Sequence, residues 1–192
     1  MGNGKKFSFH HKRKIVWMIL LGIITGGIYF ITQVESIYGG DAGDLVSAIV
    51  TRGVAHPPGY PLYTFLGILV TQIIPVSTVA WRVAFLSSIP AAVTIIFLFD
   101  LLYYLSRRLF PSLVTSLAFA FLYPIWLYAS VVEVFALNNL FTILLLWLLF
   151  HWEKEGKRKY ILLASFIFGL ALTHHHIIIF LLPSLLYIFL KR

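Results

Sequence analysis

The residues best suited to chemistry lie in one polar stretch, Gly39 to Thr64, which reads GGDAGDLVSAIVTRGVAHPPGYPLYT. It contains two carboxylates three residues apart, Asp41 and Asp44, followed by Arg52 and His56. Carboxylates and histidines are the usual groups of general acid–base catalysis, and cationic side chains stabilise negative charge that develops in a reaction. Apolar runs flank the stretch on both sides, so we expect any catalytic site of this chain to lie here.

The same residues also have purely structural interpretations. Asp41 followed by Asp44 is typical of a helix start, with Asp41 as the N-cap and Asp44 in the first turn against the helix dipole. His56 precedes Pro57 in a turn stiffened by prolines, where a solvated loop histidine is the simplest interpretation. The two interpretations of Asp41 are compatible, because a capping residue holds its carboxylate rigidly.

Two other polar groups lie within or beside apolar runs. Glu133 precedes a run that contains Asn138, and a glutamate at this position is more often a helix cap than a catalytic group. His174, His175 and His176 are consecutive, and successive helical residues point about 100° apart, so they cannot all bind one ion as an i, i+4 pair can. We therefore expect no metal site in this chain.

The composition is that of an integral membrane protein. Hydrophobic residues make up 60% and charged residues 11% of the 192 positions, against roughly 45–50% and ~25% in soluble domains. The net charge of +8 comes from short basic clusters at the ends of apolar runs, which indicates membrane topology rather than nucleic-acid binding. Cysteine is absent, which excludes disulfides and thiolate metal sites.

We predict an all-α membrane protein with about six transmembrane helices. Residues 1–14 form a basic N-terminus, and residues 33–80 form an extracytoplasmic loop that contains short juxtamembrane helices. Within this loop, Leu62 to Ile74 is too short to span a ~30 Å hydrocarbon core, so we expect an interfacial or re-entrant helix. The predicted crossings are residues 15–32, 81–105, 112–130, 134–152, 160–173 and 177–190.

The last apolar stretch, Tyr160 to Leu190, supports this division. As one helix its about 31 residues would be ~46 Å long, well beyond a single crossing. A break at residues 173–176 gives two shorter helices and returns Lys191 and Arg192 to the side of the N-terminus.

The positions of the charges set the orientation of the predicted bundle. Of the 15 Lys and Arg residues, only Arg52 and Arg82 fall outside the cytoplasmic side, so both termini are predicted to be cytoplasmic. Asp100 lies near a cytoplasmic helix end, where we expect it to reach the interface beside Arg107 and Arg108. The acidic residues on the outer side are Glu35, Asp41, Asp44 and Glu133.

Several segments of the chain resemble successive motifs of one membrane family. They are GGDAGDL, HPPGYPLYT, AWR at Ala80–Arg82, EVFALN at Glu133–Asn138 and GLALTHH at Gly169–His175. Together they resemble the protein O-mannosyltransferase-like family typified by transmembrane protein 260, within the GT-C superfamily of glycosyltransferases. The resemblance runs from roughly Glu35 to the end of the chain, and its first two motifs are the specific part.

The resemblance implies a GT-C-like arrangement of the helices and a role for each matching residue, with Asp41, Asp44 and Glu133 as the expected catalytic residues. The family's expected reaction moves a sugar, here expected to be mannose, from a polyprenyl-phosphate carrier to a Ser or Thr hydroxyl of a translocated protein, with inversion. Asp41 would be the general base, and Asp44 would orient the acceptor or share that role. Glu133 would match the second acidic position of such enzymes.

The other polar residues of the outer layer are predicted to bind substrate. A departing phosphate needs a cation, and Arg52 and Arg82 are the two on the correct side, with Arg82 at the mouth of a crossing preferred. The expected partners are membrane lipids, the lipid-linked sugar and an acceptor protein; we expect no cofactor and no nucleic acid, although the superfamily includes metal-dependent members. The predicted substrate-binding residues are Arg52, His56, Tyr60, Tyr63, Arg82, Asn138, His174 and His175.

Other functions stay open at this point. The main alternative is a non-catalytic membrane component or carrier that binds a lipid-linked sugar, and a requirement for Asp41 in turnover would separate the two. A transporter is disfavoured because no crossing carries paired mid-membrane charges or glycine-broken half-helices. Members of the family have more helices, so we expect an N-terminal portion or a short member, in a prokaryotic plasma membrane or the endoplasmic reticulum.

Overall fold

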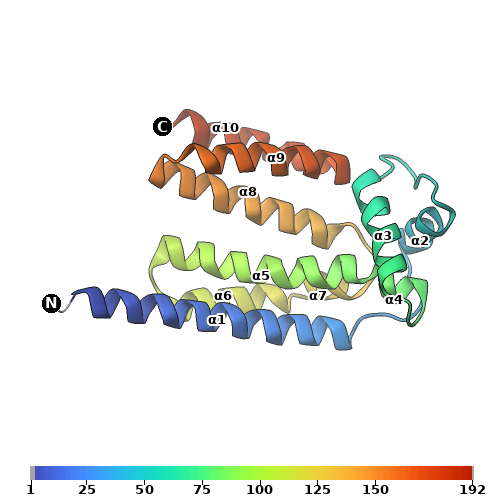
Figure 1. Cartoon of the computed structure of the whole chain (residues 1–192), viewed down its shortest axis with the longest axis horizontal. Helices are drawn as coiled ribbons and strands as arrows, with labels where there is room; N and C mark the ends of the chain where they lie inside the picture. The colour runs from blue at the N-terminus through green and yellow to red at the C-terminus, as the bar shows by residue number, and fades with distance from the viewer. Residues whose placement is uncertain (1–2, 192) are drawn as a thin grey trace.

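The chain forms a bundle of helices that run along one long axis (Figure 1). This computed structural model describes residues 3–191, with side chains described from Lys12 onward. Within that range the regular elements are all helices, which confirms the predicted all-α class. Met1, Gly2 and Arg192, which the predicted topology places on the cytoplasmic side, lie outside the described residues.

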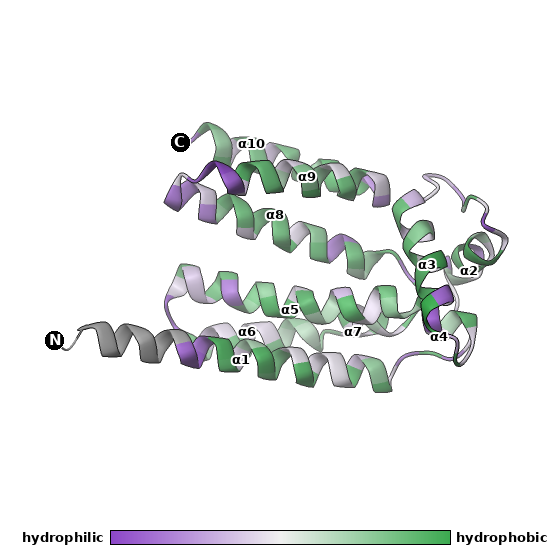
Figure 2. Cartoon of the chain, in the orientation of Figure 1, coloured by the Kyte–Doolittle hydropathy of each residue, from purple (hydrophilic) through white to green (hydrophobic). Residues whose placement is uncertain are grey.

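Within the described residues, three helical stretches are long and apolar enough to cross a membrane. Apolar residues predominate along these stretches, as expected where a helix faces lipid as well as protein (Figure 2). The chain is therefore an integral membrane protein, as predicted. The stretches are Lys12–Ile31 of α1 (Asn3–Ile31), Val79–Ser106, which joins α4 (Val79–Val83) to α5 (Phe85–Ser106), and α8 (Phe135–Glu155).

The predicted continuous helix over residues 112–130 is wrong. The chain instead forms α6 (Leu109–Ala120) and α7 (Tyr123–Ser130), whose axes differ by 61°. Pro124 lies in the first turn of α7, where its missing N–H costs nothing, but a proline cannot continue the hydrogen-bond ladder of α6. If this bent pair is one crossing, the described residues contain up to four.

The last apolar stretch divides at the histidines, as predicted. Helix α9 (Arg158–His174) ends at the extended residue His175, and a 3₁₀ helix, η1 (His176–Leu181), leads into α10 (Leu182–Leu190). These elements pack along α8, but α9 has only 17 residues and His176–Leu190 is also shorter than a full crossing. The six-helix topology therefore stays a prediction.

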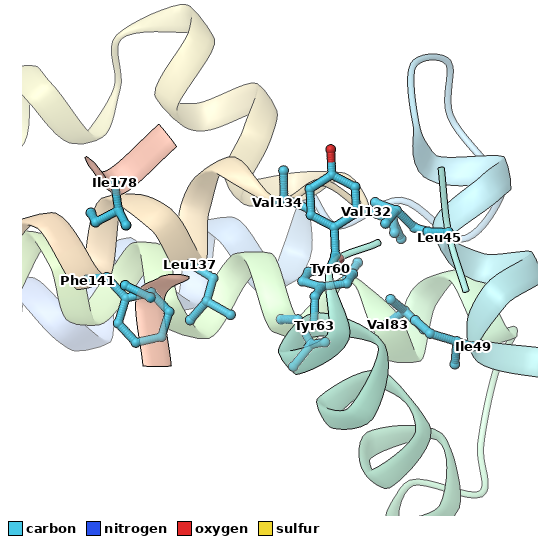
Figure 3. Packing of buried hydrophobic residues seen from close by; sticks show 14 of the residues in the cluster. Leu45, Ile49, Tyr60, Tyr63, Val83, Val132, Val134, Leu137, Phe141 and Ile178 are labelled. Atoms are coloured by element: carbon cyan, nitrogen blue, oxygen red, sulfur yellow. The ribbon is translucent and has the colours of Figure 1, made fainter. Parts of the chain in front are cut away.

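Three short helices cover the end of the bundle where α1 ends and α5 begins, opposite both termini (Figure 1). They are α2 (Ala42–Thr51), α3 (Pro61–Ile73) and α4. The 13 residues of α3 confirm the short helix predicted before Pro75. A buried apolar cluster fixes these helices to the bundle, because Leu45, Tyr63 and Val83 on the short helices pack with residues of α8 and the loop before it, Val132, Val134, Leu137 and Phe141 (Figure 3).

Asp100 lies near the other end of the bundle, and its predicted arginine partners are wrong. Its carboxylate is buried, with Oδ1 2.6 Å from Lys14 Nζ, and Oδ2 accepts a hydrogen bond of 2.8 Å from the indole N–H of Trp147. Arg107 instead ends α5, with its guanidinium over the ring of Tyr104. Proximity in sequence suggested the arginines, whereas the packing of α1 against α5 supplies the lysine.

Candidate active site

Asp41 and Asp44 stand at the start of α2, and the Asp41 carboxylate does not cap the helix. Asp41 occupies the predicted N-cap position, yet its side chain accepts no capping hydrogen bond, so the predicted capping role is wrong. Asp44 lies in the first turn, as predicted. The two side chains are 46% and 47% exposed, so a substrate in the outer layer could reach both carboxylates.

Asp44 holds His56 through two hydrogen bonds to one oxygen. Oδ2 of Asp44 accepts the backbone N–H of His56 at 2.8 Å and lies 2.7 Å from its ring Nδ1. These bonds lower the pKa of Asp44, the backbone bond most strongly, and the bond to the ring raises the pKa of His56. His56 is therefore not a free, solvated loop histidine, as the simplest interpretation has it, because Asp44 holds both its backbone and its ring.

The free edge of the His56 ring faces Asp41 and Tyr60. Nε2 lies 3.4 Å from Asp41 Oδ2 and 3.2 Å from the Tyr60 hydroxyl. Tyr60 is buried beside this ring, with a centroid separation of 5.2 Å, and adopts φ 44° directly before Pro61 opens α3. A non-glycine residue in this left-handed region is strained, and such strain persists only where neighbours hold it.

Glu133 reaches the same site from the loop before α8. It lies one residue before the N-cap, Val134, so it is not the cap of α8, and its Oε1 accepts the backbone N–H of Asp41 at 3.1 Å. The side chain is buried, which raises the pKa of its carboxyl group. Glu133 therefore positions the backbone of Asp41 rather than presenting an exposed carboxylate to a substrate.

Two residues that the sequence interpretation missed complete this arrangement. Gly40 has φ +74°, and a Cβ added there would lie 2.6 Å from Oε1 of Glu133, so any other residue would strain the backbone and displace the Glu133 side chain. Ser87 on α5 donates its hydroxyl to the carbonyl of Glu133 at 3.1 Å. The double glycine before Asp41 was an available signal for the first, but nothing in the apolar run around Ser87 marked the second.

The structure does not bring the two predicted arginines to these carboxylates. Arg82 donates to the carbonyl of Ser77 through Nη2 at 2.8 Å and to that of Thr71 through Nη1 at 3.3 Å, so it braces the connection between α3 and α4. Arg52 is exposed at the C-cap of α2, with φ 54°. Their predicted contacts with a phosphate stay predictions.

The remaining predicted substrate-binding residues form a deeper layer. Tyr63 and His174 are buried with ring centroids 5.9 Å apart, and His174 Nε2 lies 2.9 Å from the carbonyl of Val134. Oδ1 of Asn138 is buried without a hydrogen-bond partner among the described residues. Asn138 and His175 are partly exposed, and the ring of His175 lies 5.4 Å from that of Tyr60.

The site is therefore an exposed pair of carboxylates, Asp41 and Asp44, with His56 held between them. Buried Glu133 and a layer of aromatic and histidine rings lie beneath this pair. Such a surface can accept a proton from a bound hydroxyl and can place a cation beside an anionic group. Among the described side chains, no three His, Cys, Asp or Glu groups lie close enough together to hold a metal ion.

Comparisons with known proteins identify the same family that the sequence motifs of this site resemble. Residues 41–192 match the family described as the protein O-mannosyl-transferase TMEM260 N-terminal domain. The chain is 40% identical over 144 residues to the protein O-mannosyl-transferase tmem260 of Dictyostelium discoideum. It is 34% identical over 173 residues to the protein O-mannosyl-transferase TMEM260 of Mus musculus.

These relatives are much longer than the match. The aligned region covers 74% of this chain but 18% of the Dictyostelium discoideum protein, and 86% of this chain but 25% of the Mus musculus protein. No solved structure is significantly similar.

Proposed function

The chain belongs to the protein O-mannosyl-transferase TMEM260 family, and from that premise we propose that it forms the catalytic part of a membrane glycosyltransferase. The donor is a sugar on a polyprenyl-phosphate carrier, with mannose as the expected sugar. The acceptor is a Ser or Thr hydroxyl of a translocated protein, and the reaction inverts the configuration at the sugar carbon. The site faces the extracytoplasmic side, with both termini in the cytoplasm.

The proposal rests on one observation: the Asp41 carboxylate makes no capping hydrogen bond and is exposed at the surface. A general base must lie within hydrogen-bond reach of the hydroxyl that it deprotonates. Asp41 is 46% exposed, makes no capping hydrogen bond, and is fixed through its backbone N–H by buried Glu133. The backbone that carries this carboxylate is thus fixed, while the carboxylate itself stays accessible at the surface.

The position of the site also suits a donor that cannot leave the bilayer. A polyprenyl chain keeps the scissile sugar–phosphate bond at the height of the lipid headgroups. The site lies where the apolar bundle ends and α2 and α3 cover it, which is where such a bond would be found (Figure 2). The positive-inside distribution of Lys and Arg supports assigning this end to the outer face.

Sugar transfer by the full-length gene product, with and without Asp41, tests the proposal. Asp41→Asn is nearly isosteric and removes the base, so transfer from labelled polyprenyl-phosphate sugar to acceptor protein should fall by about 10²–10⁴. The matched control is Glu35→Gln, because Glu35 is an exposed acid of the outer layer outside the site.

Each outcome has a distinct meaning. Loss of transfer in folded Asp41→Asn, with Glu35→Gln active, supports Asp41 as the base. Equal transfer by parent and Asp41→Asn refutes that assignment. If the parent binds the lipid-linked sugar but transfers none, the chain is a non-catalytic binding component.

A further inference from the structure

The outer site holds three carboxylates and one group that can be positively charged among its direct contacts. Asp41 and Asp44 flank the ring of His56, and Glu133 lies beneath Asp41. A lipid-linked phosphate is itself an anion, so these carboxylates would repel the proposed donor unless a cation stood between them. The two arginines of this side do not fill that place, since Arg82 is bonded to backbone carbonyls and Arg52 forms no ion pair with the described carboxylates.

We propose that His56, as an imidazolium ion, is the cation that contacts the phosphate of the lipid-linked donor, and that Asp44 is the positioning residue that aims it. This inference rests on the proposed function, because it assigns the group that receives the donor of that reaction.

The two edges of the His56 ring are engaged to different degrees. Nδ1 lies 2.7 Å from Asp44, and the same carboxylate oxygen holds the backbone N–H of His56, so this edge is committed. Nε2 is 3.4 Å from Asp41 and 3.2 Å from the Tyr60 hydroxyl, both long for a charge-assisted hydrogen bond. The side chain is 37% exposed. The Nε2 edge is therefore available to a ligand that approaches from the surface.

The charges around the ring favour the protonated form. Contacts with carboxylates at both edges stabilise an imidazolium ion and raise the pKa of His56. No described arginine or lysine forms an ion pair with these carboxylates. The titratable groups that face the ring or its immediate neighbours are Asp41, Asp44, Tyr60, Glu133 and, beyond the Tyr60 ring, His175.

The proposed step balances in charge and atoms. The acceptor oxygen forms a bond to the sugar carbon while the bond from that carbon to the phosphate oxygen breaks, and its electron pair stays on the phosphate. The acceptor proton passes to Asp41. The polyprenyl phosphate leaves with one more negative charge than the donor carried, and the Nε2–H of His56 stabilises that charge as it develops.

Substitutions at His56 in the full-length gene product test this role through its pH dependence. His56→Gln keeps a polar side chain without the cation, so transfer should fall by about 10²–10³. Parent activity should decline as the pH rises through the pKa of His56, which lies above the ordinary 6.5. His56→Lys keeps a cation to higher pH, so it should recover about tenfold over His56→Gln and retain that activity where the parent loses it.

Binding of polyprenyl phosphate to protein in nanodiscs supplies a readout that does not depend on turnover. His56→Gln should weaken this binding at least about tenfold near neutral pH, whereas His176→Gln, an exposed histidine on η1, should leave it unchanged. Phosphatidic acid serves as the competing membrane phosphate. If it competes equally, the site recognises any lipid phosphate and the donor assignment is overturned.

The outcomes separate this inference from the proposed function. If the parent transfers no sugar, the proposed function fails, while loss of polyprenyl-phosphate binding in His56→Gln would still support the cation. If the parent transfers and His56→Gln matches it, the inference fails and the proposed function stands. If activity instead falls at low pH and His56→Lys is as inactive as His56→Gln, His56 acts as a neutral base, which also overturns the inference.

Discussion

The two ends of the helix bundle carry similar chemical groups on different scaffolds. At the end near the termini, Asp100 meets Lys14 and the indole of Trp147, and these side chains come from three long helices, α5, α1 and α8. At the opposite end, Asp41 and Asp44 at the start of α2 contact His56, which lies in the loop that follows this helix. The Asp100 side chain is 8% exposed, whereas those of the outer carboxylates are 46% and 47% exposed.

The comparison shows that burial and support, more than residue type, separate a structural ion pair from a site. The Asp100 carboxylate is enclosed, and its partner Lys14 is on another helix, so the pair fixes α1 to α5 and leaves little surface for a substrate. The outer cluster uses a histidine, and Tyr60 beside it is a non-glycine residue with positive φ. Backbone strain of this kind concentrates at functional sites because the surrounding fold has to hold it in place.

The largest expected effect on stability comes from breaking the inner pair on one side. Lys14→Met leaves Asp100 buried without its cation, which should lower the free energy of unfolding by about 3–5 kcal/mol, nearer the lower value because Lys14 is 23% exposed. Unfolding in detergent, followed by tryptophan fluorescence, measures the change. Sugar transfer per folded molecule should not change, because the pair is at the end away from the site.

The double variant Lys14→Met/Asp100→Leu is the matched control. Replacing both partners of a buried pair by apolar residues is often neutral, so the double variant should recover most of the lost stability. If the double variant is as unstable as Lys14→Met, the pair is not the reason for the loss, and the structural role assigned to this end is wrong.

A smaller loss is expected from Gly40→Ala, which acts on the outer end. The φ of +74° should cost about 1–2 kcal/mol with a side chain present, and the new Cβ would displace Glu133, whose Oε1 would be 2.6 Å away. Because Glu133 holds the backbone of Asp41, transfer should fall by more than the loss of folded protein explains.

Gly39→Ala is the control for this change. A Cβ on Gly39 would meet no atom within 4 Å, so this variant should keep both stability and transfer. Similar losses in the two variants would show that the loop tolerates no side chain at all, and would remove the specific role of the contact between Gly40 and Glu133.

The helices were largely predictable from the sequence because their signals are local. The apolar runs, Pro61 at the first position of α3 and the break at His175 all act within a few residues. The bend between α6 and α7 had an equally local signal in Pro124, but the length of the apolar run favoured one crossing.

The pairing of side chains was less predictable because it depends on tertiary contacts. Asp41 and Asp44 were identified as candidates, but their spacing fitted capping as well as catalysis and could not show that Asp44 would contact His56. Asp100 was assigned to arginines near it in sequence, although the packing of α1 brings Lys14 to it. Charge positions alone did not show that the guanidinium of Arg82 is bonded to carbonyls.

A modest effect is expected from Tyr60→Phe. The change removes the hydroxyl 3.2 Å from Nε2 of His56 and keeps the buried ring, so the free energy of unfolding should fall by about 0.5–1.5 kcal/mol. Transfer should fall only several-fold, because Asp44 still holds the other edge of the ring. Tyr187→Phe, which removes an exposed hydroxyl on α10, is the control and should change neither quantity. If Tyr60→Phe lowered transfer as much as His56→Gln does, the Tyr60 hydroxyl rather than His56 would be the principal group that contacts the substrate.

The smallest expected effect is a pH dependence of stability that belongs to the outer end. The pKa of His56 is raised above 6.5 by Asp44, so its contribution to stability is fully present below pH 6.5 and is lost as the pH rises through the raised value. The pKa of Asp44 is lowered from 3.8, so its contribution is present above pH 3.8 and is lost as the pH falls through the lowered value. His56 and Asp44 together should therefore stabilise the fold most between about pH 4 and 6.5.

The useful quantity is the difference in melting temperature between the parent and His56→Gln across this range. Burial raises the pKa of Glu133, so stability also declines as the pH rises above 4.5, and the difference removes the part of this decline that comes from burial. The parent should lose its advantage over His56→Gln as the pH rises above 6.5. A difference that stays constant from pH 5 to 9 would show that His56 does not titrate between its carboxylates. The outer cluster would then resemble the inner ion pair, and the distinction between a titratable site and a fixed structural pair would fail.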